Sequence, residues 1–253
     1  MKKVGNTLFV ILAVLSAFPV VATFIFSFRT PSGFSLGGYF DLFFDCFIFY
    51  PMFWHSIFYG VAITLLQLLI IIPCAFGFSN AKFKGKGLLF IFYIILMMMP
   101  LQVTILPNYI GLRDIGLIDK RLGIILPMAF SPFGVVVMHQ YMKSINNSLI
   151  EATRLETNSM IKVILTSVIP QIKTCAFAVV LYVFAESFNM LEQPMLFLKT
   201  REIQPLSVFI ANYDNYVGDI LFPASVIFII PIIILHTFFK KSLEKGLKLG
   251  DLL

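Results

Sequence analysis

Six long apolar segments limit what this chain can fold into. The hydrocarbon core of a bilayer is about 30 Å thick, and a helix needs about 20 mostly apolar residues to cross it. Residues 174–191 contain one acid, Glu186, and the other five segments contain no Asp, Glu, Lys or Arg: 7–28, 54–78, 87–110, 122–142 and 220–239. None shows the alternation of barrel strands, so helices must satisfy the backbone. We therefore predict an all-α integral membrane protein with six transmembrane helices.

The composition excludes a soluble fold. Apolar residues make up 59% of the 253 residues and charged residues 13%, which is about half the charged share of a soluble domain. We expect one domain, in which residues 1–53 form the first span and an outer loop, 54–240 a five-helix core and 241–253 a cytoplasmic tail. The chain starts like a signal peptide, but its first apolar run exceeds the usual length of roughly 7–15 residues. We expect this run to be retained as an anchor.

Basic residues predict the orientation. With the N-terminus in the cytoplasm, thirteen of the nineteen Lys and Arg residues fall on the inner segments 1–6, 79–86, 143–173 and 240–253. Cytoplasmic segments of membrane proteins carry an excess of Lys and Arg, so both termini are expected in the cytoplasm. The net charge of +6 follows from this topology and does not indicate a nucleic acid partner.

Prolines interrupt the predicted spans. They are Pro73, Pro100, Pro107, Pro127, Pro132 and Pro231. Proline within a membrane helix frees a backbone carbonyl and kinks the axis, and a neighbouring helix or a cavity must satisfy the freed group. This density of prolines favours a protein that moves or lines a pathway over an inert anchor.

Glu186 is the one acid within the spans. An ionisable group inside a membrane is costly to bury, so it is a candidate for a substrate pathway. Glu186 lies near the outer end of its span, which leaves a hydrogen bond to a neighbouring helix as the alternative. Asn189, one turn later, is a second candidate for the solute pathway, with a helix-binding role as its alternative. The three cysteines have no metal-ligand spacing, so neither a metal site nor a bound cofactor is predicted.

The cytoplasmic loop of residues 143–173 is the most informative connection. Ser148 and Glu151 have the spacing of a capping box, which predicts a short helix beginning at Leu149. Its apolar side would consist of Leu149, Ala152 and Leu155.

The helix is expected to end near residues 157–159. Asn158 tolerates the left-handed conformation that closes helices, and Ser159 can cap the helix that follows. The residues alone leave two alternatives open: a helix-turn-helix that meets a partner, or an amphipathic helix that lies on lipid.

A family resemblance begins in this loop. Glu151-Ala152-Thr153 is followed by Thr157 and then by Ile169-Pro170. This pattern resembles the cytoplasmic loop of binding-protein-dependent ABC permeases, whose motif reads Glu-Ala-Ala, three residues, Gly, and some ten residues later a hydrophobic residue and Pro. Other stretches resemble the carbohydrate-uptake, MalG-like branch, in the right order over residues 55–250: 99–107, 116–119, 126–127, 132–134, 188–189 and Pro194.

The resemblance implies that the loop docks on a cytoplasmic ATPase subunit. The coupling residues implied are Ser148, Leu149, Glu151, Ala152, Thr153, Leu155, Thr157, Asn158 and Pro170. Thr153 and Thr157 stand where the family has Ala and Gly. Because β-branched Thr is unfavourable at positive φ, we expect the turn to shift to Asn158 and docking to be weaker or tuned to a particular partner.

The resemblance also implies the partners. They are a second homologous permease subunit, a pair of ATPase subunits and an extracytoplasmic solute-binding protein, in the cytoplasmic membrane of a bacterium or archaeon. The sequence contains no G-x-x-x-x-G-K-[ST] phosphate-binding loop, so ATP is expected to bind a partner and this chain is expected to be a transport subunit without enzymatic activity of its own.

Other classes of membrane protein fit less well. A proton-coupled secondary carrier would show several buried acids and repeat symmetry, and a membrane-embedded enzyme would show clustered Asp, Glu or His in its spans. The substrate-capturing component of a vitamin transporter could match in helix number but lacks the loop motif. A sugar or small oligosaccharide is the expected solute, and glycerol phosphates and other polar solutes remain open.

Overall fold

The computed structural model describes residues 2–31, 33–145, 147–212 and 220–250, and these are mostly helical. The longer helices are α1 (Lys2–Phe26), α3 (Phe49–Asn80), α4 (Lys86–Met97), α5 (Leu101–Asp114), α6 (Arg121–Ala129), α7 (Pro132–Ser144), α8 (Asn147–Glu156), α10 (Ile169–Phe188) and α13 (Leu221–Gly250). The shorter elements are the strands β1 (Arg29–Thr30) and β2 (Gly33–Phe34), the helices α2 (Gly37–Phe40), α9 (Met160–Val163), α11 (Glu192–Phe197) and α12 (Leu206–Ala211), the π-helical turns η1 (Asp41–Asp45) and η2 (Ile164–Val168), and the 3₁₀ turn η3 (Arg201–Ile203).

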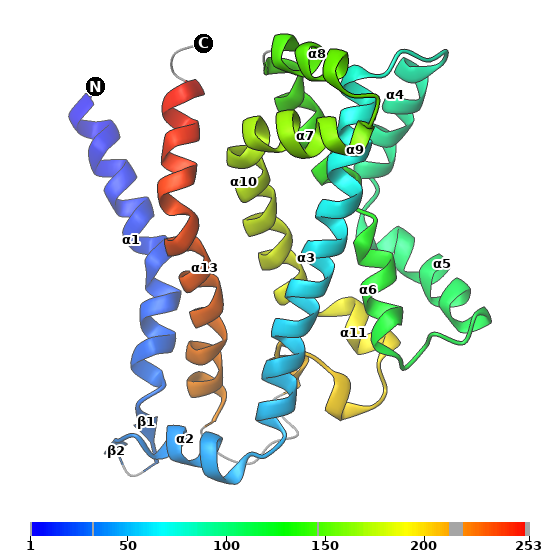
Figure 1. Cartoon of the computed structure of the whole chain (residues 1–253). Helices are drawn as coiled ribbons and strands as arrows, with labels where there is room; N and C mark the ends of the chain where they lie inside the picture. The colour runs from blue at the N-terminus through cyan, green and yellow to red at the C-terminus, as the bar shows by residue number, and fades with distance from the viewer. Residues whose placement is uncertain (1, 32, 146, 213–219, 251–253) are drawn as a thin grey trace.

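Helix α3 is the centre of the bundle. It packs against α10, α7 and α6, while α13 packs against α10 and α1 packs against α13 (Figure 1). Tyr59, Ile63 and Ile71 of α3 are at most 1% exposed and anchor the core. Helix α7 approaches α3 closely at Gly134, where a Cβ atom would overlap the Ile71 side chain.

Five of the six predicted spans correspond to apolar helices. Four helical segments are long and apolar enough to cross a bilayer: Phe49–Asn80, Arg121–Ser144, Met160–Phe188 and Leu221–Lys240. Helix α1 is 25 residues long and is apolar from Ile11 to Phe26. A multi-pass helical membrane protein is therefore the correct class, and the count of six spans stays a prediction.

The third predicted span, residues 87–110, is not one straight helix. Helices α4 and α5 meet at an angle of 97° across a break of a few residues. Pro100 lies at the break as the N-cap of α5, with extended backbone angles of φ −67° and ψ 149°. Proline also disfavours the helical conformation of the residue before it, which explains why the helix ends here. Four of the other prolines lie inside helices: Pro73, Pro107, Pro127 and Pro231.

Two helices extend beyond the predicted spans. Helix α3 begins at Phe49, within the predicted outer loop. Helix α13 continues past the candidate span Leu221–Lys240 to Gly250, so the predicted tail is helical up to that residue, and the boundaries of the predicted domain parts stay predictions. Residues 251–253 of the predicted tail lie outside the described residues.

Three features share one end of the molecule. The N-terminal end of α1, the C-terminal end of α13 and helix α8 lie together, and the β1–β2 hairpin and α2 lie at the opposite end (Figure 1). The arrangement agrees with the expectation that both termini and the 143–173 loop are on the same side of the membrane.

Candidate functional site

Helix α8 has a buried side and an exposed apolar side. Ile150 is 1% exposed and joins the main core together with Val163 of α9. On the other side, Leu155 is 91% and Leu149 is 50% exposed, and Ala152 is exposed as well. The apolar side predicted from the sequence therefore points away from the rest of the chain.

Both ends of α8 differ from the prediction. The helix begins at Asn147, so Ser148 lies inside it and is not its N-cap; the preceding position, residue 146, lies outside the described residues. Asn158 does not adopt the left-handed conformation, because Asp119 is the one non-glycine residue with positive φ in the described part of the chain.

Threonine and serine side chains form the turn instead. The Thr157 amide donates to the Thr153 carbonyl, which extends the helical pattern, and the Thr157 hydroxyl accepts from the Ser159 amide at 3.3 Å. The Ser159 hydroxyl accepts from the Lys162 amide, so the predicted cap of the next helix is confirmed. Pro170 lies in the first turn of α10, a position where its missing N–H is tolerated.

Thr153 attaches α8 to the membrane helices. Its hydroxyl lies 2.5 Å from the Ser167 hydroxyl in η2 and donates to the Leu149 carbonyl. Ser167 is 1% exposed and Thr153 is half-buried, so this contact lies at the edge of the protein interior. Next to it, the Arg154 guanidinium lies 5.7 Å from the centre of the Phe76 ring in α3. Thr153, one of the two residues that depart from the family motif, thus supplies an anchor that sequence reasoning had not assigned.

A second candidate region is an open cleft of about 660 Å³. It is bordered by α3, α4, α5, the α6–α7 junction, α10 and α11. Its polar lining consists of Gln67, Thr104, Asn108, Ser131, Glu186 and Gln193, to which Tyr182 adds a phenol group. The cleft is therefore the place where this chain gathers polar groups inside an apolar bundle.

The two predicted pathway residues have different positions. Glu186 lines the cleft together with Tyr182, which precedes it by one turn on the same helix. Asn189 is the C-cap of α10, and its amide nitrogen donates to the Ala185 carbonyl at 2.9 Å. Asn189 is not one of the residues that line the described cleft. Gln67 and Gln193 do line it, and neither was identified from the sequence.

Asp119 links the connection between α5 and α6 to the connection between α11 and η3. Its Oδ1 atom accepts from the Lys199 and Thr200 amides, both at 2.8 Å, and its Oδ2 atom accepts from the Thr200 hydroxyl at 2.7 Å. Its own amide donates to the Phe197 carbonyl. These bonds, first of all those from Thr200, hold the pKa of the Asp119 carboxyl below its usual value. They also explain the left-handed φ of +60° at this residue.

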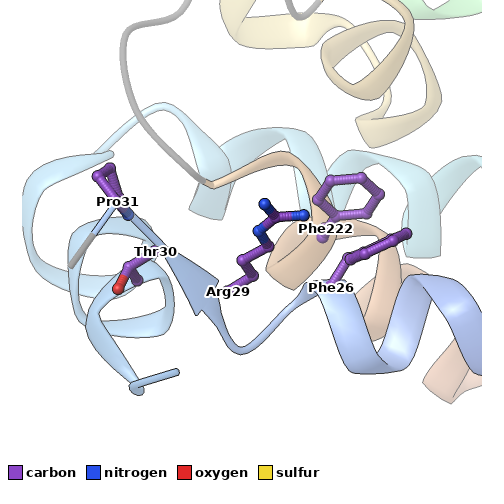
Figure 2. Close-up of a pocket in the computed structure, with 5 residues that line it drawn as sticks. All are labelled: Phe26, Arg29, Thr30, Pro31 and Phe222. Atoms are coloured by element: carbon purple, nitrogen blue, oxygen red, sulfur yellow. The ribbon is translucent and has the colours of Figure 1, made fainter. Parts of the chain in front are cut away.

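A third hollow lies where α1 meets the hairpin. Figure 2 shows the rings of Phe26 and Phe222 next to each other on one side of Arg29, and Thr30 and Pro31 on its other side. The two rings are 5.5 Å apart. Aromatic and basic side chains gather at membrane–water boundaries, so this hollow marks the end of the first and last spans that is opposite α8.

Known proteins share both sequence and fold with this chain. The arabinooligosaccharides transport system permease protein AraQ of Bacillus subtilis (strain 168) is 28% identical over 87% of this chain and 79% of that protein. The trehalose/maltose transport system permease protein MalG of Thermococcus litoralis is 25% identical over 96% of this chain and 94% of that protein. The sn-glycerol-3-phosphate transport system permease protein UgpE of Brucella abortus (strain 2308) is 23% identical over 77% and 71%.

The fold has a solved counterpart. A chain of a bacterial ABC transporter involved in the import of the acidic polysaccharide alginate superposes with a TM-score of 0.83, at 22% identity, over 95% of each chain. The family model for the binding-protein-dependent transport system inner membrane component matches residues 67–249. That match covers more than half of the chain and confirms the resemblance found in the sequence, so the chain belongs to the binding-protein-dependent transport system inner membrane components.

Proposed function

We propose that this chain is one of two permease subunits of an ABC importer that takes up a sugar or a similar small polar solute. The observation that carries the proposal is α8, whose apolar side is uncovered at the same end of the molecule as both termini. An exposed apolar patch on a structured element indicates a surface for a partner. A cytoplasmic ATPase subunit fits this role because the sequence has no phosphate-binding loop of its own.

The remaining parts of the importer follow from this assignment. The basic residues favour a cytoplasmic location for α8 and both termini. The hairpin end then faces outward, where an extracytoplasmic solute-binding protein would deliver the solute. A second homologous permease would complete the pathway along the cleft. The relatives that carry arabinooligosaccharides and trehalose or maltose in their names support a sugar as the solute.

A matched pair of variants tests the role of α8. Glu151 and Glu156 are both exposed carboxylates on this helix, and the family motif includes only the first. Co-expressed with its ATPase and second permease, the tagged chain should recover the ATPase and hydrolyse ATP. Glu151→Ala should reduce that recovery several-fold, and Glu156→Ala should not. Normal recovery with Glu151→Ala, or ATP hydrolysis by the pure chain alone, would contradict the proposal.

A further inference from the structure

The hollow where α1 meets the β1–β2 hairpin holds one cation among apolar side chains. It has a volume of about 520 Å³ and is lined by Phe26, Arg29, Thr30, Pro31 and Phe222. The two phenylalanine rings lie together on one side of Arg29 and the proline lies on the other (Figure 2). A molecule that enters this hollow therefore meets a guanidinium group and apolar surface at the same time.

Arg29 has no counter-charge in the described part of the chain. The one ion pair between described residues joins Arg113 to Asp114. The hydroxyl of Thr30 donates to the Gly33 carbonyl within the hairpin, so Arg29 is the side chain of the hollow that is suited to bind an anion. Its guanidinium stays charged at any physiological pH and presents its N–H donors as a planar fork, which matches the oxygens of a phosphate or a carboxylate.

The hollow lies at the level where two apolar segments end. Phe26 is the last residue of the apolar helix Ile11–Phe26, and Phe222 is the second residue of the candidate span Leu221–Lys240. These two helices, α1 and α13, pack against each other. Arg29 follows Phe26 by three residues, so its guanidinium lies at the boundary between hydrocarbon and water. The phosphate groups of membrane lipids lie at the same level.

The surface next to the hollow is suited to acyl chains. Val14, Phe18 and Val21 follow one face of α1 at helical spacing and are 64%, 68% and 52% exposed. A lipid bound at Arg29 can therefore keep its chains against apolar surface. A soluble anion would lose its water beside two phenylalanine rings for the sake of one cation, and removing a charge from water is costly. The hollow thus favours a lipid over a free anion.

We propose that this hollow binds an anionic phospholipid, whose phosphate pairs with Arg29 and whose glycerol and first acyl carbons lie against Phe26 and Phe222. A zwitterionic lipid fits less well, because its own ammonium group competes with Arg29 for the phosphate. The lipid belongs to the leaflet opposite α8 and joins the ends of α1 and α13. Its binding requires neither an ATPase nor a solute, so the site goes beyond the proposed permease function.

Lipid binding to the purified full-length chain tests the proposal. The chain is freed of native lipid and titrated in native mass spectrometry with phosphatidylglycerol, phosphatidylcholine and diacylglycerol that carry the same acyl chains. Phosphatidylglycerol should bind several-fold more tightly than diacylglycerol, which lacks the phosphate, and phosphatidylcholine should lie between them. Inorganic phosphate at millimolar concentration should not displace phosphatidylglycerol, because the lipid also gains the apolar contacts.

A matched pair of arginine variants locates the site. Arg29→Gln removes the charge and should lower the affinity for phosphatidylglycerol several-fold, to about that for diacylglycerol. Arg113→Gln is the control, because Arg113 is also an exposed arginine but lies 3.3 Å from Asp114; it should bind phosphatidylglycerol as the unchanged chain does. Arg29 is exposed, so Arg29→Gln should fold, and its thermal unfolding without lipid should match that of the unchanged chain.

Four results would overturn the lipid site. They are equal binding of diacylglycerol and phosphatidylglycerol, displacement of the lipid by inorganic phosphate, undiminished binding of phosphatidylglycerol to Arg29→Gln, and an equal loss with Arg113→Gln. The last of these would show a general attraction between basic residues and anionic lipid in place of a site at Arg29. None of the measurements involves an ATPase, so failure of the permease function would leave the test of the lipid site valid.

Discussion

Helix α8 and the cleft collect their functional groups in opposite ways. The groups of α8 come from one ten-residue helix, Asn147–Glu156. Those of the cleft come from α3, α5, the α6–α7 junction, α10 and α11, which are far apart in the sequence. The exposure of the two sets also differs: Leu155 is 91% exposed, whereas Gln67 is 2% exposed.

This difference shows what each region can recognise. Exposed leucines on a short helix stabilise a complex when a large partner surface covers them, so α8 suits a protein partner. The cleft has apolar and aromatic walls with a few polar side chains, which is typical of small-molecule sites, so the cleft suits a solute. A disturbance of one region should therefore leave the function of the other measurable.

The largest expected effect separates the two regions directly. Leu155→Asp should reduce recovery of the ATPase about tenfold or more, because burying a leucine contributes about 1.5–3 kcal/mol and each 1.4 kcal/mol is a factor of about ten in affinity. The fold should be unchanged, since the side chain is 91% exposed and such substitutions shift stability by about 0.5 kcal/mol at most. The measurement is pull-down of the ATPase by the tagged chain.

Gln193→Met is the counterpart from the other region. It should recover the ATPase as the unchanged chain does and reduce solute uptake, because Gln193 lines the cleft. If Leu155→Asp recovers the ATPase normally, or if both variants lose recovery equally, the separation between a protein-binding helix and a solute-binding cleft is wrong.

The sequence predicted α8 better than it predicted its ends. The exposed side of Leu149, Ala152 and Leu155 follows from the helical spacing of these residues. This spacing depends on neighbouring residues only, so the folded protein retains it. The left-handed turn at Asn158 was wrong because asparagine tolerates that conformation without requiring it. The hydroxyls of Thr157 and Ser159 supplied another way to end one helix and begin the next.

The length of each apolar span could be predicted from the sequence, but the direction of its helix axis could not. The apolar run of residues 87–110 is long enough to cross a bilayer, yet it bends by 97° near Pro100. Pro73 also lies in a long apolar run, and α3 continues through it. A proline weakens a helix in either setting, and packing against the surrounding helices, which the sequence does not display, decides whether the helix breaks.

Of the polar residues that line the cleft, only the ionisable one, Glu186, was predicted from the sequence. Glu186 was identified because an acid inside an apolar span is unusual. Gln67 lies in such a span and Gln193 in a connecting segment, and a neutral amide carries no comparable signal in either place. The packing of α3 against α6 and α10 and of α11 against α6 and α5 brings these groups to one cleft.

An intermediate effect is expected at the anchor of α8. Thr153→Val keeps the branched shape and removes the hydroxyl that contacts Ser167. A hydrogen bond of this kind contributes about 1 kcal/mol, so α8 should open about five times more often. Hydrogen exchange of the α8 amides should show this increase, while exchange in α3 should be unchanged.

Thr166→Val is the matched control for Thr153. The Thr166 hydroxyl also donates to a carbonyl four residues earlier, that of Lys162 at 2.7 Å, but its side chain is exposed. Its loss should affect exchange less. A double-mutant cycle of Thr153→Val with Ser167→Ala should give a coupling energy of about 1 kcal/mol, whereas additive effects would show that the two hydroxyls do not stabilise each other.

The smallest effect is expected at Asp119, which holds the connection after α11 as Thr153 holds α8. Its pKa is lowered in the folded protein, so the ionised carboxylate contributes stability above the unfolded pKa of about 3.9. That stability should be lost as the pH falls through the folded pKa. Between pH 5 and 8 (roughly the range of maximal stability), this residue should cause no change with pH.

Asp119→Asn tests the contribution of the charge. The asparagine carbonyl can still accept from the amides of Lys199 and Thr200, so the variant should lose less than about 1 kcal/mol at neutral pH, where solvent screens an exposed charge. The difference between the two chains in thermal unfolding should shrink as the pH falls below about 4, because the aspartate itself becomes neutral. Asp114→Asn is the matched control, since that carboxylate lies 3.3 Å from Arg113 on the exposed surface and such pairs contribute little. If the difference in thermal unfolding between the unchanged chain and the Asp119→Asn variant stays constant into acid, hydrogen-bond geometry, and not charge, holds these two connections together.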